Sequence, residues 1–159
     1  MSDAPQPERL AAALVAEDVD FVVIGGFAAI AHGAPRVTRD LDVVVEPSSD
    51  NLTRLGRMLA AADARVLGHA EAEAVRDADL AEVGLGATLH TVTRFGRFDV
   101  VGAPAGAAPY ASLRSRSVAG RLGATEVRIA GLDDLIAMKR AAGRELDLRD
   151  IADLTEPRD

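Results

Sequence analysis

The chain has 159 residues, of which 48% are hydrophobic and 27% charged, and these values predict one globular domain over 1–159 and exclude extensive disorder. Its 18 basic and 25 acidic residues give a net charge of −7, which opposes nonspecific binding to nucleic acid because phosphate affinity comes from Lys and Arg. The chain contains no cysteine, so disulfides, thiolate zinc sites and thiol nucleophiles are excluded.

Apolar runs in the chain are short. The runs at 21–24 and 43–45 fall far below the ~20 residues that span a bilayer. Residues 1–9 are polar and lack the cationic head of a signal peptide. We therefore expect a cytoplasmic protein without a membrane partner.

Hydrophobic spacing predicts the elements of the first half of the chain. The apolar run at 21–24 ends at Gly25-Gly26 and is typical of a buried strand. Ser48, Ser49 and Asp50 offer an N-cap for the helix that follows them. Together the patterns predict helices at 7–17, 27–32 and 51–62 and strands at 21–24 and 39–45.

The second half of the chain begins with an uninformative stretch. Residues 63–85 are acidic, rich in alanine and weakly periodic, so they are expected to form a loop or an irregular helix. The later patterns predict hairpins that pair 88–93 with 97–101 and 118–121 with 126–129, and helices at 110–117, 132–142 and 147–154. This order of elements favours an α/β or α+β fold in which helices cover a mixed sheet.

Two carboxylates stand out in the second predicted strand. Asp40 and Asp42 are two residues apart, and the period of a strand places both on one face. Carboxylates that project together from an apolar strand repel each other and lose hydration, so they require a compensating cation. Mg²⁺ suits this pair, because it commonly takes one or two carboxylates and completes its shell with water and substrate phosphates.

A third carboxylate, Asp99, has apolar neighbours on another predicted strand. Three aspartates on neighbouring strands are able to hold two metal ions about 3.5–4 Å apart, the arrangement that aligns an attacking and a leaving oxygen around phosphorus. The sequence thus predicts a two-metal site formed by Asp40, Asp42 and Asp99.

A glycine pair precedes these carboxylates. Gly25 and Gly26 end the first strand and open a helix, where free backbone N–H groups are placed to receive a phosphate. The distance of 40 − 26 = 14 residues from Gly26 to Asp40 fits one short helix that returns to an adjacent strand.

These motifs give the chain a specific resemblance over roughly residues 20–155. The matching residues are Val23-Ile24-Gly25-Gly26, Ala28, His32-Gly33, Arg36-x-Thr38-x-Asp40-Leu41-Asp42 and Asp99. They resemble the signature of the DNA-polymerase-β-like nucleotidyltransferase superfamily. Residues 132–140, followed by Gly143-Arg144, Asp147 and Asp150, are similar to the C-terminal helices of small bacterial members, among them the abortive-infection-type toxin nucleotidyltransferases. Residues 63–94 carry no matching motif.

The resemblance implies a minimal nucleotidyltransferase fold and the transfer of a nucleoside monophosphate from an NTP to an acceptor hydroxyl, with release of pyrophosphate. Asp40 and Asp42 would bind both Mg²⁺ ions, and Asp99 would bind the metal at the acceptor and help to remove the proton of its hydroxyl. Lys139 would contact the triphosphate, and Arg36 is a further candidate phosphate contact. Longer relatives carry an added helical domain for acceptor binding, so the acceptor stays open between RNA, protein and a small molecule.

Alternative interpretations remain for each motif. Asp40 and Asp42 also fit a solvated edge strand or a glycosyltransferase Asp-x-Asp, whereas an EF-hand is excluded by the apolar residues 43–45. The chain has no Gly-x4-Gly-Lys-[Ser/Thr] run, which excludes a P-loop. Arg36 also fits an ordinary surface cation, and Lys139 a solvated charge at a helix end. A noncatalytic, partner-binding module with the same fold is the alternative to an enzyme.

The remaining polar residues are assigned plainer roles. His32, His69 and His90 are expected to be structural or exposed, and Asp147 and Asp150 to be cap and surface residues.

The charge is distributed unevenly along the chain. Residues 94–128 hold six arginines against Asp99 and Glu126, a local charge of 6 − 2 = +4. If Arg97, Arg114, Arg116 and Arg121 line an acceptor path, RNA is the favoured acceptor. An antitoxin is the expected protein partner, by the resemblance.

Overall fold

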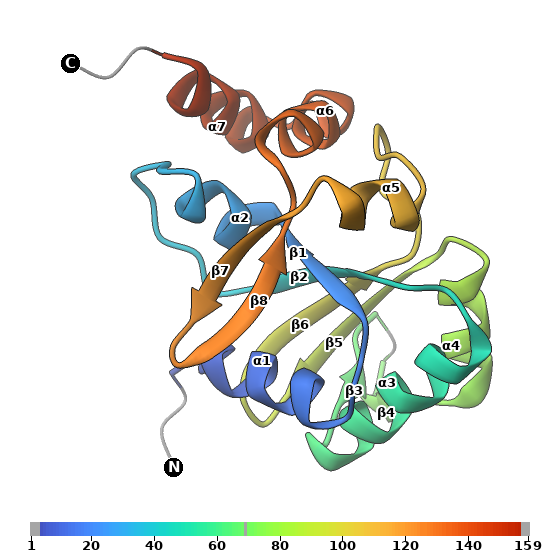
Figure 1. Cartoon of the computed structure of the whole chain (residues 1–159). Coiled ribbons are helices and arrows are strands. Elements are labelled where there is room, and N and C mark those ends of the chain that lie inside the picture. The colour runs from blue at the N-terminus through green and yellow to red at the C-terminus, as the bar shows by residue number, and fades with distance from the viewer. Residues whose placement is uncertain (1–3, 69, 157–159) are drawn as a thin grey trace.

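The computed structural model describes residues 4–68 and 70–156, and its elements are labelled in Figure 1. The helices are α1 (Pro7–Ala16), α2 (Gly25–Ala31), α3 (Ser49–Ala61), α4 (Asp77–Gly84), α5 (Tyr110–Ser115), α6 (Leu132–Ala142) and α7 (Glu145–Thr155). The strands are β1 (Phe21–Ile24), β2 (Leu41–Val45), β3 (Arg65–Val66), β4 (Glu73–Ala74), β5 (Thr88–Thr93), β6 (Gly96–Val101), β7 (Val118–Leu122) and β8 (Thr125–Ile129).

All the strands join one mixed sheet in the order β4-β3-β5-β6-β2-β1-β8-β7. β1 pairs antiparallel with β2 and parallel with β8, and β2 pairs parallel with β6. β1 and β2 lie at the centre and are almost wholly apolar, because strands covered on both faces need hydrophobic side chains on both. The predicted mixed sheet under helices is therefore confirmed.

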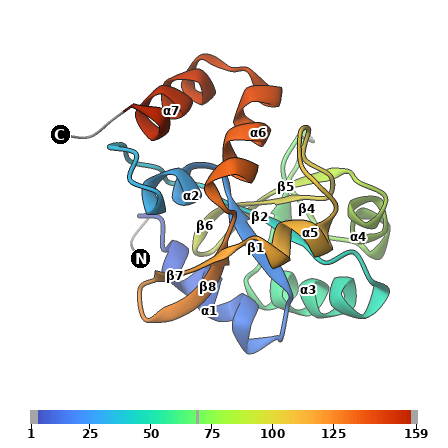
Figure 2. The ribbon, with the colours of Figure 1, turned by 45° about the horizontal axis from the view of Figure 1, so that its top comes forward.

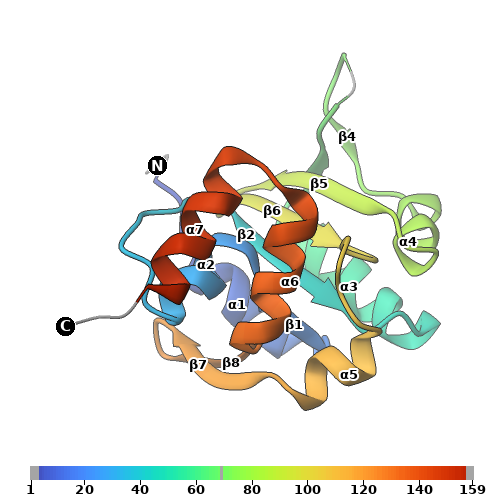
Figure 3. The same cartoon turned by 90° about the horizontal axis from the view of Figure 1, so that it is seen from above.

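Helices cover both faces of the sheet. In Figure 1, α2, α6 and α7 lie above the central strands, and α1 and α3 lie below them. Figure 2 shows α6 and α7 above the sheet, and Figure 3, seen from above, shows α6 in front of β1 and β2 and α7 in front of α2. None of the helices within the described ranges combines the length and apolar character that a membrane crossing requires.

The chain passes from β1 into α2 without a loop. Gly25 has φ +67°, a conformation that side chains with a Cβ rarely adopt, and this allows the sharp turn. The helix predicted at 27–32 consequently begins two residues earlier, at Gly25. Both glycines thus belong to the first turn of α2.

The stretch 63–85 is more ordered than its sequence predicted. It contains β3, β4 and α4, and the expected loop or irregular helix is wrong. β3 and β4 have two residues each, too few to show the alternation of a strand. α4 buries only Leu80 and Val83, which gives it weak periodicity, and its start is stabilised by the Asp79 carboxylate, which accepts a hydrogen bond from the Arg76 backbone N–H.

The two predicted hairpins are confirmed. β5 pairs with β6 and β7 pairs with β8, both antiparallel. The strand predicted over 39–45 starts later, at Leu41, so Asp40 precedes it. The last helix starts at Glu145, two residues earlier than predicted.

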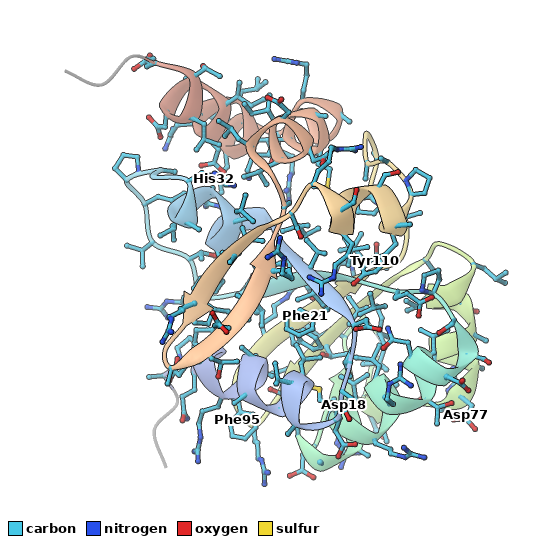
Figure 4. The ribbon with its side chains drawn as sticks, in the orientation of Figure 1. Asp18, Phe21, His32, Asp77, Phe95 and Tyr110 are labelled. Carbon is cyan, nitrogen blue, oxygen red and sulfur yellow. The ribbon has the colours of Figure 1, made fainter. Side chains whose placement is uncertain are left out.

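His32, at the end of α2, links this helix to the residue that follows β8, the strand paired with β1. Its Nε2 donates a hydrogen bond to the Ala130 carbonyl oxygen over 2.7 Å, just before α6 begins. Figure 4 labels His32 between α2 and the C-terminal helices. The residue is half-buried and structural, as predicted, and it helps to set the distance between α2 and α6.

Candidate active site

A cleft of about 520 Å³ lies between the central strands and the C-terminal helices. It is lined by Ile24, Gly25, Asp40, Asp42, His90, Arg97, Asp99, Val101, Pro104, Ala105, Leu135, Met138, Lys139, Ala142, Arg144 and Asp147. The fold thus brings five of the seven predicted site residues to one cleft, and only Gly26 and Arg36 are not among the residues that line it.

Asp42 and Asp99 face each other across the parallel pair β2 and β6, in direct register. Burial raises the pKa of Asp42 to about 7, and the charge of Asp99, a hydrogen bond with Asp99 and the charge of Asp40 act in the same direction. Arg144 acts in the opposite direction. The pair therefore concentrates negative charge at one place in the cleft.

Asp40, the residue immediately before β2, is the third carboxylate of the cleft. Its side chain is 47% exposed, against 10% for Asp99. Asp40 Oδ2 lies 3.9 Å from Arg97 Nε, so Asp40 faces the cleft from the solvent side.

Arg97 and His90 are the basic groups nearest to Asp99. Arg97 Nε donates a hydrogen bond to Asp99 Oδ1 over 3.3 Å. His90 Nδ1 lies 3.1 Å from the same oxygen, and Arg97 Nη2 lies 3.5 Å from His90 Nδ1. Strand pairing explains the group, because His90 is opposite Asp99 and Arg97 shares the face of Asp99 two residues away.

His90 was expected to be structural or exposed, and its side chain is half exposed at the cleft. Its proximity to Asp99 was not predicted. The only signal for it in the sequence was the hairpin register, which a one-residue shift would change.

The carboxylates do not form a complete metal cage as they stand. Among the residues that the structure describes, no three His, Cys, Asp or Glu side chains are placed to hold one ion together. Arg97 lies between Asp40 and Asp99 and neutralises part of their charge. The donor set nevertheless fits a divalent cation, because the carboxylates of Asp40, Asp42 and Asp99 line one cleft and carboxylate oxygens are ligands that Mg²⁺ takes.

Gly25 and Gly26 have different surroundings. A Cβ on Gly25 would overlap the carboxylate of Asp42, so this glycine brings the backbone against the acidic group and lines the cleft. Gly26 is buried, and a Cβ there would lie 2.6 Å from Arg36 Nη2 and 2.8 Å from Thr38 Oγ1. Gly26 therefore provides space for the segment that leads to Asp40.

Lys139 is not a solvated helix-end charge. It is 5% exposed, and its Nζ donates to Asp150 Oδ2 over 2.7 Å and lies 3.8 Å from Asp147 Oδ1. Arg36 Nε lies 3.1 Å from the other oxygen of Asp150. The expected surface position of Asp147 and Asp150 is wrong, because they are 2% and 0% exposed and neutralise buried cations, although Asp147 does cap α7.

Arg144 was not assigned to the site by the sequence. It follows the left-handed Gly143 that ends α6, and its side chain is 78% exposed at the cleft. Its Nε donates to Asp147 Oδ2 over 2.7 Å. Burial alone would raise the pKa of Asp147, but the hydrogen bond and charge of Arg144 and the charge of Lys139 lower it overall.

The arginines of 94–128 do not form one path. Arg97 alone among the four candidates lines the cleft. Arg116 forms an ion pair with Asp134 at 2.8 Å, Arg114 lines a separate cavity against α1, and Arg121 lies near the hairpin tip, away from the end of β8 that enters α6. The structure therefore does not place Arg114, Arg116 and Arg121 beside Arg97 at the cleft, and the acceptor stays a prediction.

His69 lies outside the described residues.

Comparison with known proteins agrees with this geometry. Residues 9–156 match the family model described as the nucleotidyl transferase AbiEii toxin of a type IV toxin–antitoxin system. No curated protein matches the sequence.

Solved structures share the fold at low sequence identity. The solution structure of the antibiotic-resistance factor ANT(2'')-Ia superposes with a TM-score of 0.56 at 14% identity, covering 94% of this chain and 78% of that one. The crystal structure of an antigenic nucleotidyltransferase-like protein from Paracoccidioides brasiliensis gives a TM-score of 0.50 at 18% identity, covering 96% and 78%. Since the family model spans nearly the whole chain, this protein belongs to the AbiEii nucleotidyltransferase toxin family and is a nucleotidyltransferase.

Proposed function

We propose that this enzyme moves a nucleoside monophosphate from an NTP to an acceptor hydroxyl in a reaction that depends on Mg²⁺. The observation that carries the proposal is the pair Asp42 and Asp99, which face each other in register on β2 and β6 and line the same cleft as Asp40. The cleft volume of about 520 Å³ is within the range of small-ligand sites.

In this proposal Asp40 and Asp42 would hold two Mg²⁺ ions, and Asp99 would join them in holding the one at the acceptor. When bound, the ions neutralise charge on the triphosphate and on the reacting oxygens. The Asp99 carboxylate receives the proton of the acceptor hydroxyl, whose oxygen bonds to the α-phosphorus. The bond from the α-phosphorus to its bridging oxygen breaks, and pyrophosphate leaves with the electron pair.

The cations of the C-terminal helices support the triphosphate end of this arrangement. Arg144 is exposed at the cleft and affects Asp42 electrostatically, which suits a direct contact with phosphate. Lys139 lines the same cleft, but two carboxylates already neutralise it, so we assign it a long-range electrostatic role. Gly25 offers backbone at the start of α2, whereas Gly26 and Arg36 position the segment that carries Asp40.

The family also supports a biological role. Its description as a type IV toxin leads us to propose that the protein acts as the toxin of a toxin–antitoxin pair. The acceptor is defined only as a hydroxyl that reaches Asp99.

The test uses NTPs labelled at either the α or the γ phosphate, with Mg²⁺ and a cell extract. Transfer as proposed places the α label on the acceptor and the γ label in pyrophosphate. Asp40→Asn, Asp42→Asn and Asp99→Asn should each reduce transfer at least about 100-fold, because each removes a charge that stabilises the transition state. Asp133→Asn, an exposed carboxylate at the start of α6, should not.

Two outcomes would contradict the proposal. A γ label on the acceptor would indicate phosphoryl transfer instead. Normal transfer by Asp42→Asn would remove the metal assignment.

A further inference from the structure

We propose that Arg97 is an internal counter-cation of the carboxylate site, which a free divalent ion must displace, so that the site binds the metal–NTP complex in preference to the free ion. The inference rests on the proposed function and adds a selectivity that the carboxylates do not themselves provide.

The position of the guanidinium carries the argument. Arg97 Nε lies 3.3 Å from Asp99 Oδ1 and 3.9 Å from Asp40 Oδ2, so one cationic group approaches two of the three carboxylates. In the proposed function the ion at the acceptor side would be held by Asp40, Asp42 and Asp99, so Arg97 approaches two of its three ligands. Arg97 therefore occupies the electrostatic position of that ion.

Strand geometry keeps Arg97 in this position. Arg97 and Asp99 are two residues apart on β6 and share a face, and His90 on β5 approaches both side chains. The Arg97 side chain is 43% exposed, against 10% for Asp99. A half-exposed arginine on a long flexible stem is able to withdraw into solvent, whereas the carboxylate stays in the cleft.

Opposite effects on two ligands follow from this arrangement. A free divalent ion brings only positive charge and must compete with Arg97 for Asp40 and Asp99. A metal–NTP complex carries net negative charge, so a displaced Arg97 attracts it. Loss of the Arg97 charge should therefore strengthen binding of the free ion and weaken binding of the complex.

The experiment measures Mn²⁺ binding by titration calorimetry, first with no nucleotide and then as the Mn²⁺ complex of each of the common NTPs. Arg97→Gln should bind free Mn²⁺ about tenfold more tightly, the scale expected when one charge is removed at a few ångströms near a protein surface. The same variant should bind its preferred Mn²⁺–NTP complex several-fold more weakly. Arg97→Lys keeps the charge but not the planar guanidinium, so both of its affinities should lie between those of wild type and of Arg97→Gln.

Arg121→Gln is the matched control, because it removes the same charge from the far end of the β7–β8 hairpin. It should change neither affinity by more than about twofold. The proposal is overturned if Arg97→Gln leaves free Mn²⁺ affinity unchanged, or if both affinities shift in the same direction.

Failure of the proposed function gives a different result. If Asp42→Asn binds the Mn²⁺–NTP complex as tightly as wild type, and the double variant Asp42→Asn with Arg97→Gln binds free Mn²⁺ as tightly as Arg97→Gln alone, the carboxylates are not a metal site and both proposals are wrong. If Asp42→Asn abolishes binding of the Mn²⁺–NTP complex while Arg97→Gln binds both free Mn²⁺ and the complex as wild type does, only the role of Arg97 is wrong.

Discussion

Lys139 and Asp150 form a buried ion pair that joins α6 to α7, with Nζ 2.7 Å from Oδ2 and residue exposures of 5% and 0%. Arg36, from the segment between α2 and β2, reaches the other oxygen of Asp150 at 3.1 Å. One carboxylate thus links the C-terminal helices to the segment that carries Asp40. These contacts therefore connect the two sides of the cleft, the C-terminal helices and the segment before β2.

Removal of that carboxylate should destabilise the fold. Asp150→Ala removes the counter-charge of Arg36 and leaves buried Lys139 with only Asp147 at 3.8 Å, so we expect the free energy of unfolding to fall by about 3–5 kcal/mol. Urea denaturation measures the change. Glu145→Ala on the same helix breaks only an exposed pair and should cost less than about 1 kcal/mol. If the two variants lower the free energy of unfolding equally, the buried ion pair contributes no more to stability than the exposed one.

The raised pKa of Asp42 predicts a specific pH dependence in metal-free protein. The folded state holds the Asp42 proton up to a pKa of about 7, whereas the unfolded chain releases it near 3.8. The folded state therefore binds more protons between these values, and stability falls as pH rises from about 4 to 7. Full expression of the shift corresponds to at most about 4 kcal/mol.

Asp42→Asn should remove this dependence and make the metal-free protein about 2 kcal/mol more stable than wild type at pH 8, because the repulsion is relieved. Denaturation in a chelator across pH 4–8 tests it. Asp133→Asn should instead follow the wild-type pH profile. Parallel profiles for wild type and Asp42→Asn would contradict the prediction.

The two glycines at the start of α2 should respond differently to alanine. Gly25→Ala introduces a Cβ at φ +67° against the Asp42 carboxylate, so it should lose Mg²⁺–NTP binding at least about tenfold and be destabilised by about 1 kcal/mol or more. Gly26→Ala instead presses on Arg36 and Thr38 and should lower stability by about 1–3 kcal/mol, with a smaller effect on binding.

Thermal unfolding with and without Mg²⁺–NTP separates stability from binding in these variants. Gly68→Ala is the control, since it has a positive φ but nothing within 4 Å of its Cβ. The assignment fails if Gly26→Ala damages binding more than Gly25→Ala does.

The separate positions of the arginines predict that Arg116 and Arg121 contribute little to the salt dependence of acceptor binding. Because Arg116 is paired with Asp134 and Arg121 lies near the hairpin tip, the double change to Gln should leave the transfer rate within about twofold of wild type. The apparent affinity for the acceptor, measured from low to high salt, should then have the same slope in both proteins. A reduced slope in the double variant would show that an extended polyanionic acceptor crosses these arginines.

Local patterns in the sequence determined much of the fold. The apolar run of β1, the hairpin formed by β5 and β6 and the glycine that ends α6 depend on contacts between residues near one another in the chain. Asp40, Asp42 and Asp99 were recognisable as candidates because carboxylates on apolar strands are costly, and the parallel register of β2 and β6 brings Asp42 to face Asp99.

Only the tertiary structure decided which charged side chains are buried and which partners they pair with. Lys139 and Asp150 are of residue types that usually lie on the surface. They are buried here only because α7 folds back on α6 and because Arg36 approaches from a segment distant in sequence. The arginines of 94–128 are close in sequence, yet different strands and helices carry them to separate places. Burial and charge pairing depend on contacts between distant segments, and one sequence gives no direct signal for those contacts.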